Sequence, residues 1–145
     1  MIVFDTDVIA SVLQRMPPTD LIRRLASLDP ADQATTSISA GELVVSARSS
    51  SDPERLLTAL DRLVWPNLAI IPFDRRAAQE YGRLRVELEA KGQFVSEPEL
   101  LIGAICMSRG ATLVTGSDER FSILSGLNVV NWLAPPGGGG KEREQ

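Results

Sequence analysis

Short apolar runs alternate along the chain with stretches in which apolar residues recur every three or four positions. Runs of this length are typical of buried strands, and the longer spacing is typical of amphipathic helices. The runs predict strands at residues 2–4, 34–38, 68–71, 111–114 and 129–130. The intervening spacing predicts helices capped by Thr6 or Asp7 and by Ser39, helices that begin at Thr19, Asp74 and Ser96, and a helix over residues 54–64. This alternation predicts an α/β fold, a three-layer α/β/α sandwich around a short, mostly parallel sheet of about four to five strands.

Two of the expected helices begin with the spacing of a capping box. Ser39 and Glu42 have this spacing, and so do Ser96 and Glu99. In a capping box, the hydroxyl and the glutamate each bind a backbone N–H group at the start of the helix. Each glutamate can therefore stabilise its own helix, or it can face a functional site.

The length of 145 residues predicts one domain, expected over residues 1–134. Residues 135–145 are rich in proline, glycine and charge, and they predict a disordered tail. No stretch is apolar enough to span a bilayer, and the acidic start MIVFDTD does not resemble an export signal. The single cysteine, Cys106, cannot form an internal disulfide. These features predict a cytoplasmic protein without membrane association.

The chain contains no histidine. This absence excludes mechanisms with an imidazole base and metal sites that depend on histidine ligands. Catalysis would have to use carboxylates, hydroxyls, arginines or lysines, and carboxylates with a hard divalent cation are the combination that fits best. The net charge of −4 is a poor basis for binding nucleic acid by electrostatics alone. It does not exclude a nuclease whose acidic site holds cations.

Four acids are candidates for one site because ligands collect at the carboxyl ends of parallel strands. Asp5 ends the first predicted strand, and Asp118 follows the fourth. Glu42 and Glu99 lie on the first turns of two helices. If those turns lie above neighbouring strands, the four carboxylates converge. Such a cluster needs cations to offset its mutual repulsion, and carboxylate oxygens suit Mg²⁺ or Mn²⁺.

The order of these residues resembles the PIN-domain family, and the VapC-type toxins within it, over roughly residues 1–133. The segments that carry the resemblance are IVFDTDVI from Ile2, TSISAGEL from Thr36, PFDRRAAQEYGRLR from Pro72, ELLIGA from Glu99, LVTGSDERF from Leu113 and LNVVNW from Leu127. The resemblance implies a PIN-like sandwich and an endoribonuclease that depends on one or two Mg²⁺ or Mn²⁺ ions. It also implies an RNA substrate, a cognate VapB-type antitoxin and a homodimer.

The resemblance also implies roles for individual residues. It implies that the metal ligands and catalytic acids are Asp5, Glu42, Glu99 and Asp118, supported by Thr6, Asp7, Thr115 and Ser117. The chain departs from the family's pattern at Glu99, where aspartate is usual, and at Ser117, where aspartate or asparagine is common. Asp118 follows immediately and can replace Ser117 through a shifted turn. Asp7 replaces the family's usual asparagine and adds a negative charge.

Two other functions fit parts of the sequence. Because Glu99 and Ser117 depart from the family's pattern, the domain could bind RNA or an antitoxin without efficient cleavage. Separately, the segment Asp5-Thr6-Asp7-Val8 resembles the first motif of haloacid-dehalogenase-type phosphatases, with Asp5 as nucleophile. The later motifs of that family have no room in the chain after Thr115.

Overall fold

The computed structural model describes residues 1–134 and shows one sheet between two layers of helices. The sheet order is β3-β2-β1-β4-β5, and every neighbouring pair is parallel. The strands are β1 (Ile2–Phe4), β2 (Gln33–Thr36), β3 (Ala69–Ile71), β4 (Thr112–Val114) and β5 (Asn128–Val130). The predicted α/β sandwich with a short parallel sheet is confirmed. The tail predicted at residues 135–145 lies outside the described residues.

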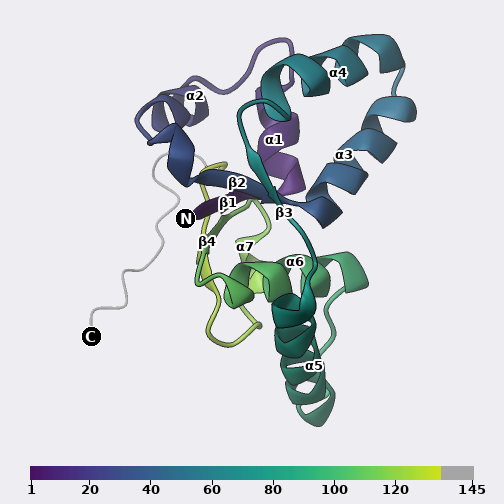
Figure 1. The fold of residues 1–145 in the computed structure, drawn as a ribbon, viewed down its shortest axis with the longest axis vertical. Helices are drawn as coiled ribbons and strands as arrows, with labels where there is room; N and C mark the ends of the chain where they lie inside the picture. The colour runs from purple at the N-terminus through teal and green to yellow at the C-terminus, as the bar shows by residue number, and fades with distance from the viewer. Residues whose placement is uncertain (135–145) are drawn as a thin grey trace.

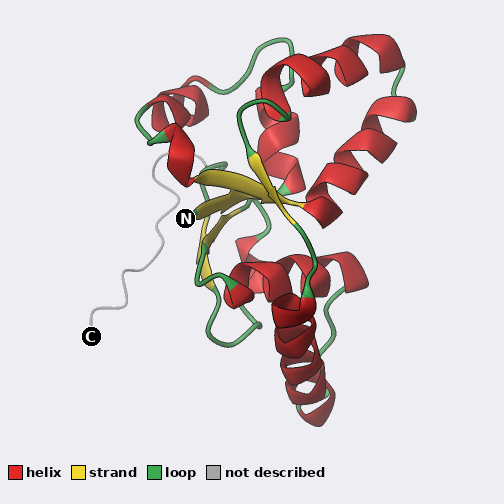
Figure 2. Ribbon diagram, viewed as in Figure 1, coloured by secondary structure: helices red, strands yellow, loops and turns green. Residues whose placement is uncertain are grey.

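Helices cover both faces of the sheet, as Figures 1 and 2 show. In the view of Figure 1, one layer lies above the sheet and contains α1 (Thr6–Val12), α2 (Thr19–Ala26), α3 (Ser37–Arg48) and α4 (Pro53–Ala59). The layer below contains α5 (Arg75–Ala90), α6 (Glu97–Ser108) and α7 (Asp118–Phe121). A 3₁₀ turn (Pro30–Asp32) precedes β2, and a π-helix (Leu60–Val64) continues α4. No helix of residues 1–134 is long and apolar enough to cross a membrane.

The alternation of side chains along the strands divides the interior into two cores. Val3 belongs to the core below the sheet with Leu84 of α5. The next residue, Phe4, belongs to the core above the sheet with Leu43 of α3. Cys106 is fully buried in the lower core, where burial raises the pKa of its thiol to about 12. The sheet is therefore buried on both faces, which explains why its strands read as continuous apolar runs.

The structure corrects three local predictions. The second strand ends at Thr36 rather than Ile38, and Thr36, not Ser39, is the N-cap of α3. Neither Thr6 nor Asp7 caps α1, because Asp5 itself is the N-cap. The helix predicted from Glu54 through residue 64 changes at Leu60 from an α-helix to a π-helix.

The register of the sheet brings its carboxyl ends together at one edge. Phe4 of β1 pairs with Val114 of β4, and the Asp5 N–H donates to the Val114 carbonyl at 2.9 Å. The residues that follow these two strands, Asp5 and Thr115, therefore lie side by side. On the other side of β1, the Thr35 hydroxyl donates to the Phe4 carbonyl at 2.8 Å and fixes β2 against the same strand end.

Candidate active site

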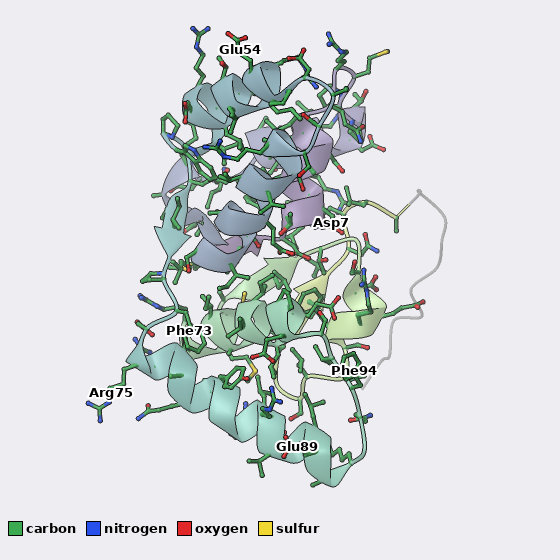
Figure 3. The ribbon with its side chains drawn as sticks, turned by 90° about the vertical axis from the view of Figure 1, so that its right-hand side faces the viewer. Asp7, Glu54, Phe73, Arg75, Glu89 and Phe94 are labelled. Carbon is green, nitrogen blue, oxygen red and sulfur yellow. The ribbon has the colours of Figure 1, made fainter. Side chains whose placement is uncertain are left out.

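A polar cleft of about 350 Å³ opens at the carboxyl ends of the strands. Its acidic lining comes from α1, α3, α6 and the residue before α1, namely Asp5, Asp7, Glu42 and Glu99. The rest of the lining is Thr6, Ser96, Pro98, Ile102, Ser117, Arg120 and Phe121. Figure 3 shows Asp7 at the level where the upper helices meet the lower ones. Three of the four predicted catalytic acids therefore share one cleft with Asp7.

Asp5 is held in place by both of its carboxylate oxygens. Oδ1 accepts a hydrogen bond from the Thr6 N–H at 2.8 Å, which caps α1. Oδ2 accepts from the Thr115 hydroxyl at 2.7 Å, and the Thr115 oxygen in turn accepts from the Ser117 N–H at 3.0 Å. Thr115 is fully buried. The predicted supporting residue Thr115 therefore contacts Asp5 directly.

The environment of Asp5 opposes its negative charge. Asp5 is 7% exposed, and burial is the main cause that raises its pKa from 3.8 to about 6. The hydrogen bonds from Thr115 and Thr6 lower this pKa, whereas the negative charges of Asp7 and Glu42 raise it further. A carboxyl group that is buried among like charges is the kind of group that a bound cation would stabilise in its ionised form.

Glu42 faces the cleft and takes no part in capping α3. The Thr36 hydroxyl accepts from the Ser39 N–H at 3.0 Å, so the expected capping box of Ser39 and Glu42 does not form. Instead, Glu42 Oε1 accepts a hydrogen bond from the Thr6 hydroxyl at 2.8 Å. Thr6 therefore links α1 to α3 and positions Glu42 beside Asp5. Glu42 therefore does not stabilise the start of its own helix, and its carboxylate faces the cleft.

Asp7 fixes the turn after β4. Its Oδ2 accepts from the Gly116 N–H at 2.9 Å, while its Oδ1 is buried without a hydrogen-bond partner. A Cβ atom at Gly116 would lie 2.8 Å from Asp7 Oδ2 and 2.8 Å from Leu133 Cδ1, so a larger residue there would displace one or both of these side chains. The unpaired Oδ1 leaves one acceptor of this acid available at the site.

Glu99 lies on the opposite side of the cleft, in the first turn of α6. Its N–H donates to the Ser96 hydroxyl at 3.4 Å, which forms one half of the expected capping box. Its carboxylate instead forms an ion pair with Arg120, 2.9 Å from Oε1 to Nη1. Arg120 is not among the site residues predicted from the sequence. The available signal was its position three residues after Ser117, which returns it to the same side of a helical turn.

Ser117 and Asp118 are the two candidates for the fourth polar residue of the site, and their side chains lie in different places. Ser117 lines the cleft, and its hydroxyl accepts from Arg120 Nη2 at 2.8 Å. Asp118 does not line the cleft, and its Oδ1 accepts from the Asn131 side chain at 2.8 Å. The structure therefore places Ser117, and not Asp118, in the cleft that Asp5, Glu42 and Glu99 line.

The donor set suits a hard divalent cation, although the acids are not gathered around one point. Carboxylate and hydroxyl oxygens are the ligands that Mg²⁺ and Mn²⁺ prefer. The buried, unpaired Oδ1 of Asp7 and the raised pKa of Asp5 both favour a positive charge in the cleft. Within residues 1–134, however, no three acidic side chains already form a group that could hold an ion. Glu42 is bound by the Thr6 hydroxyl and Glu99 by Arg120.

The sequence matches the PIN domain family over residues 2–127. The chain therefore belongs to the PIN domain family, as its resemblance and its sheet predict. Among its relatives, Ribonuclease VapC2 of Rickettsia felis is 34% identical over 99 residues, which is 68% of this chain and 73% of the relative. The tRNA(fMet)-specific endonuclease VapC of Shigella flexneri is 27% identical over 128 residues, 88% of this chain and 95% of that protein.

The fold also agrees with a solved complex. The crystal structure of VapBC2 from Rickettsia felis, bound to a DNA fragment from its promoter, superposes with a TM-score of 0.82 at 30% identity. The match covers 91% of this chain and 99% of the other. Both the PIN-domain fold and the resemblance to VapC proteins are thus confirmed. The haloacid-dehalogenase alternative gains no support from these relatives, and Asp7 Oδ2 is engaged with the Gly116 N–H.

Proposed function

We propose that the protein is the toxin of a VapBC-type pair and an endoribonuclease that hydrolyses RNA with one or two Mg²⁺ or Mn²⁺ ions. The single observation that carries the proposal is the cleft at the carboxyl ends of the strands, which is lined by Asp5, Glu42, Glu99 and Asp7. VapC ribonucleases related along most of this chain give the reaction its class. Asp5, Asp7, Glu42 and Glu99 would hold the cation, and Asp118 would act only from outside the cleft.

In this proposal the acids of the cleft bind the cation, and the neighbouring threonines hold these acids in position. Thr115 and the Thr6 N–H fix the two oxygens of Asp5, and the Thr6 hydroxyl fixes Glu42. Ser117 offers a hydroxyl to the same cleft. When bound, the cation would stabilise charge on the phosphodiester and strengthen water as a nucleophile at neutral pH.

The reaction that this arrangement supports is hydrolysis of one phosphodiester bond. The oxygen of water bonds to phosphorus, the bond from phosphorus to the 3′ oxygen breaks, and that oxygen receives a proton. The products are a 5′-phosphate and a 3′-hydroxyl. Without histidine, the proton acceptors available within the cleft are its carboxylates.

The VapC relatives and an apolar cavity at the surface both support an antitoxin as a partner. A cavity of about 110 Å³ lies among Val8, Val12, Leu25 and Leu63, and its lining is almost entirely apolar. Leu63 remains 58% exposed beside it. An apolar segment of an antitoxin would bury these side chains. We also propose a homodimer in the cytoplasm, as the family resemblance and the composition predict.

The substitution Glu42→Gln tests the catalytic proposal. We expect cleavage of RNA with Mg²⁺ or Mn²⁺ to be lost, because an amide cannot supply the negative charge that a cation requires. The free energy of unfolding should stay the same or rise slightly, because the amide oxygen of the new side chain can still accept from Thr6 and one negative charge near Asp5 disappears. RNA cleavage assays and urea denaturation of the two purified proteins measure both effects.

The matched control is Glu54→Gln, an exposed glutamate at the start of α4 that does not line the cleft. This variant should cleave RNA like the parent protein. Equal cleavage by Glu42→Gln and the parent would contradict the proposed site. If the folded parent protein, freed of antitoxin, cleaves no RNA with either cation, the domain is a binding module instead.

A further inference from the structure

A positively charged side chain already occupies the cleft that the proposed function assigns to a cation. Arg120 places its guanidinium between two residues of the lining, with Nη1 2.9 Å from Glu99 Oε1 and Nη2 2.8 Å from Ser117 Oγ. Glu99 comes from the start of α6, whereas Ser117 and Arg120 come from the turn and helix after β4. The guanidinium therefore ties the two sides of the cleft together.

The two partners of the ion pair differ in how freely they can move. The side chain of Glu99 is 15% exposed, and α6 holds it against the cleft. The side chain of Arg120 is 67% exposed and belongs to a helix of four residues. Breaking the pair therefore requires little movement of Glu99, because Arg120 can turn toward solvent while Glu99 stays in the cleft.

The ion pair also engages one of the acids that line the cleft. Within the described chain no three acidic side chains form a group that could hold an ion, even though Asp5, Glu42 and Glu99 line one cleft. A guanidinium beside Glu99 Oε1 disfavours a divalent cation at the same oxygen, since the two positive charges repel each other. A cation that binds this oxygen therefore competes with Arg120.

We propose that Arg120 is the internal counter-ion of Glu99 and competes with the divalent cation for this carboxylate. This inference rests on the proposed function, because it assumes that the cleft takes Mg²⁺ or Mn²⁺. In the cation-free protein, Arg120 offsets the charge of Glu99 and links it to Ser117. Binding of the cation displaces Arg120, so the affinity for the cation includes the cost of breaking the ion pair.

The test is the binding of Mn²⁺ to metal-free protein, measured by isothermal titration calorimetry. Arg120→Gln should bind Mn²⁺ roughly two- to fivefold more tightly than the parent, as expected from the loss of one largely exposed ion pair. The control is Arg23→Gln, which removes the same charge from an exposed pair with Asp20 on α2, away from the cleft lining. Circular dichroism checks that both variants are folded.

Each outcome of the titration decides the inference. A gain in affinity in Arg120→Gln that exceeds the gain in Arg23→Gln supports it, and so does binding that only Arg120→Gln shows. Equal gains in the two variants would reduce the effect to net charge and overturn it. Weaker binding by Arg120→Gln would overturn it as well, because Arg120 would then help to build the site. If none of the three proteins binds Mn²⁺, the proposed metal-dependent function fails together with this inference.

Discussion

At the scale of single residues, Asp5 combines a structural hydrogen bond with an unfavourable charge. Its Oδ1 caps α1, and its Oδ2 accepts from Thr115. Burial nevertheless makes the ionised form costly. The fold therefore needs the oxygens of Asp5 but gains nothing from its negative charge when no cation is bound. An uncharged side chain of the same shape should separate these two roles.

The substitution Asp5→Asn should stabilise the metal-free protein at high pH. The pKa of Asp5 is raised to about 6 in the folded protein, so the parent loses stability as the pH rises from about 4 to above 6 and Asp5 must ionise. At about pH 8, we expect the variant to be more stable by up to roughly 2–3 kcal/mol. Thermal unfolding in the presence of a chelator, followed at several pH values, measures the difference.

The pH dependence of the stability difference distinguishes an effect of charge from an effect of packing. The advantage of Asp5→Asn should shrink as the pH falls toward about 4, because Asp5 is then largely neutral in the folded chain and increasingly neutral in the unfolded chain. An advantage that stays constant with pH would mean that packing, and not charge, causes it. Lower stability of the variant at about pH 8 would show that the Thr115 and Thr6 hydrogen bonds require a carboxylate.

At the scale of elements, the position of the N-cap of α3 determines whether Glu42 lies in the first turn of that helix. Thr36 ends β2 and caps α3, and this leaves the buried hydroxyl of Ser39 without a partner. Because the helix begins earlier than its sequence suggests, Glu42 lies beyond the first turn and is free to face the cleft.

Two substitutions in α3 test this assignment of the cap. Thr36→Val keeps the shape of the side chain and removes the oxygen that accepts from the Ser39 N–H, so it should cost about 0.5–2 kcal/mol of stability. Ser39→Ala removes a buried hydroxyl that has no partner, so stability should stay the same or rise. Urea denaturation of both variants provides the comparison. A larger loss in Ser39→Ala than in Thr36→Val would restore Ser39 as the cap.

The strands and most helices could be predicted from the sequence, whereas the cap of α3 and the contact of Arg120 could not. Hydrophobic spacing predicted the strands and most helices, because burial on both faces of the sheet leaves a strong apolar signal. The cap was misplaced because Thr36 and Ser39 are both good capping residues, and only the end of β2 decides between them. Arg120 was missed because its partner, Glu99, is distant in sequence and meets it only once α6 and α7 are folded at the two ends of β4.

At the scale of the whole molecule, the sheet depends on both helical layers. Each strand has only three or four residues, and strands this short depend on packing against helices for their stability. The upper core and the lower core therefore share the strands that separate them. We expect the described domain to unfold in a single cooperative transition.

The substitution Leu84→Ala tests this coupling between the layers. Leu84 is fully buried in the lower core, and its truncation should cost about 2–5 kcal/mol. Trp65 and Trp132 pack against the upper core and report on it by fluorescence. The fluorescence transition should shift as far as the transition seen by circular dichroism. Separate transitions would show that the upper layer unfolds independently.

The double role of Asp5 also has a genetic consequence. Aspartate and asparagine codons differ by one nucleotide, and asparagine can cap α1 through its side-chain oxygen just as Asp5 does. A single point mutation can therefore remove the charge that the proposed chemistry requires and leave the molecule folded. A cell that carries such a gene could escape the toxin in one step while its antitoxin still had a surface to bind.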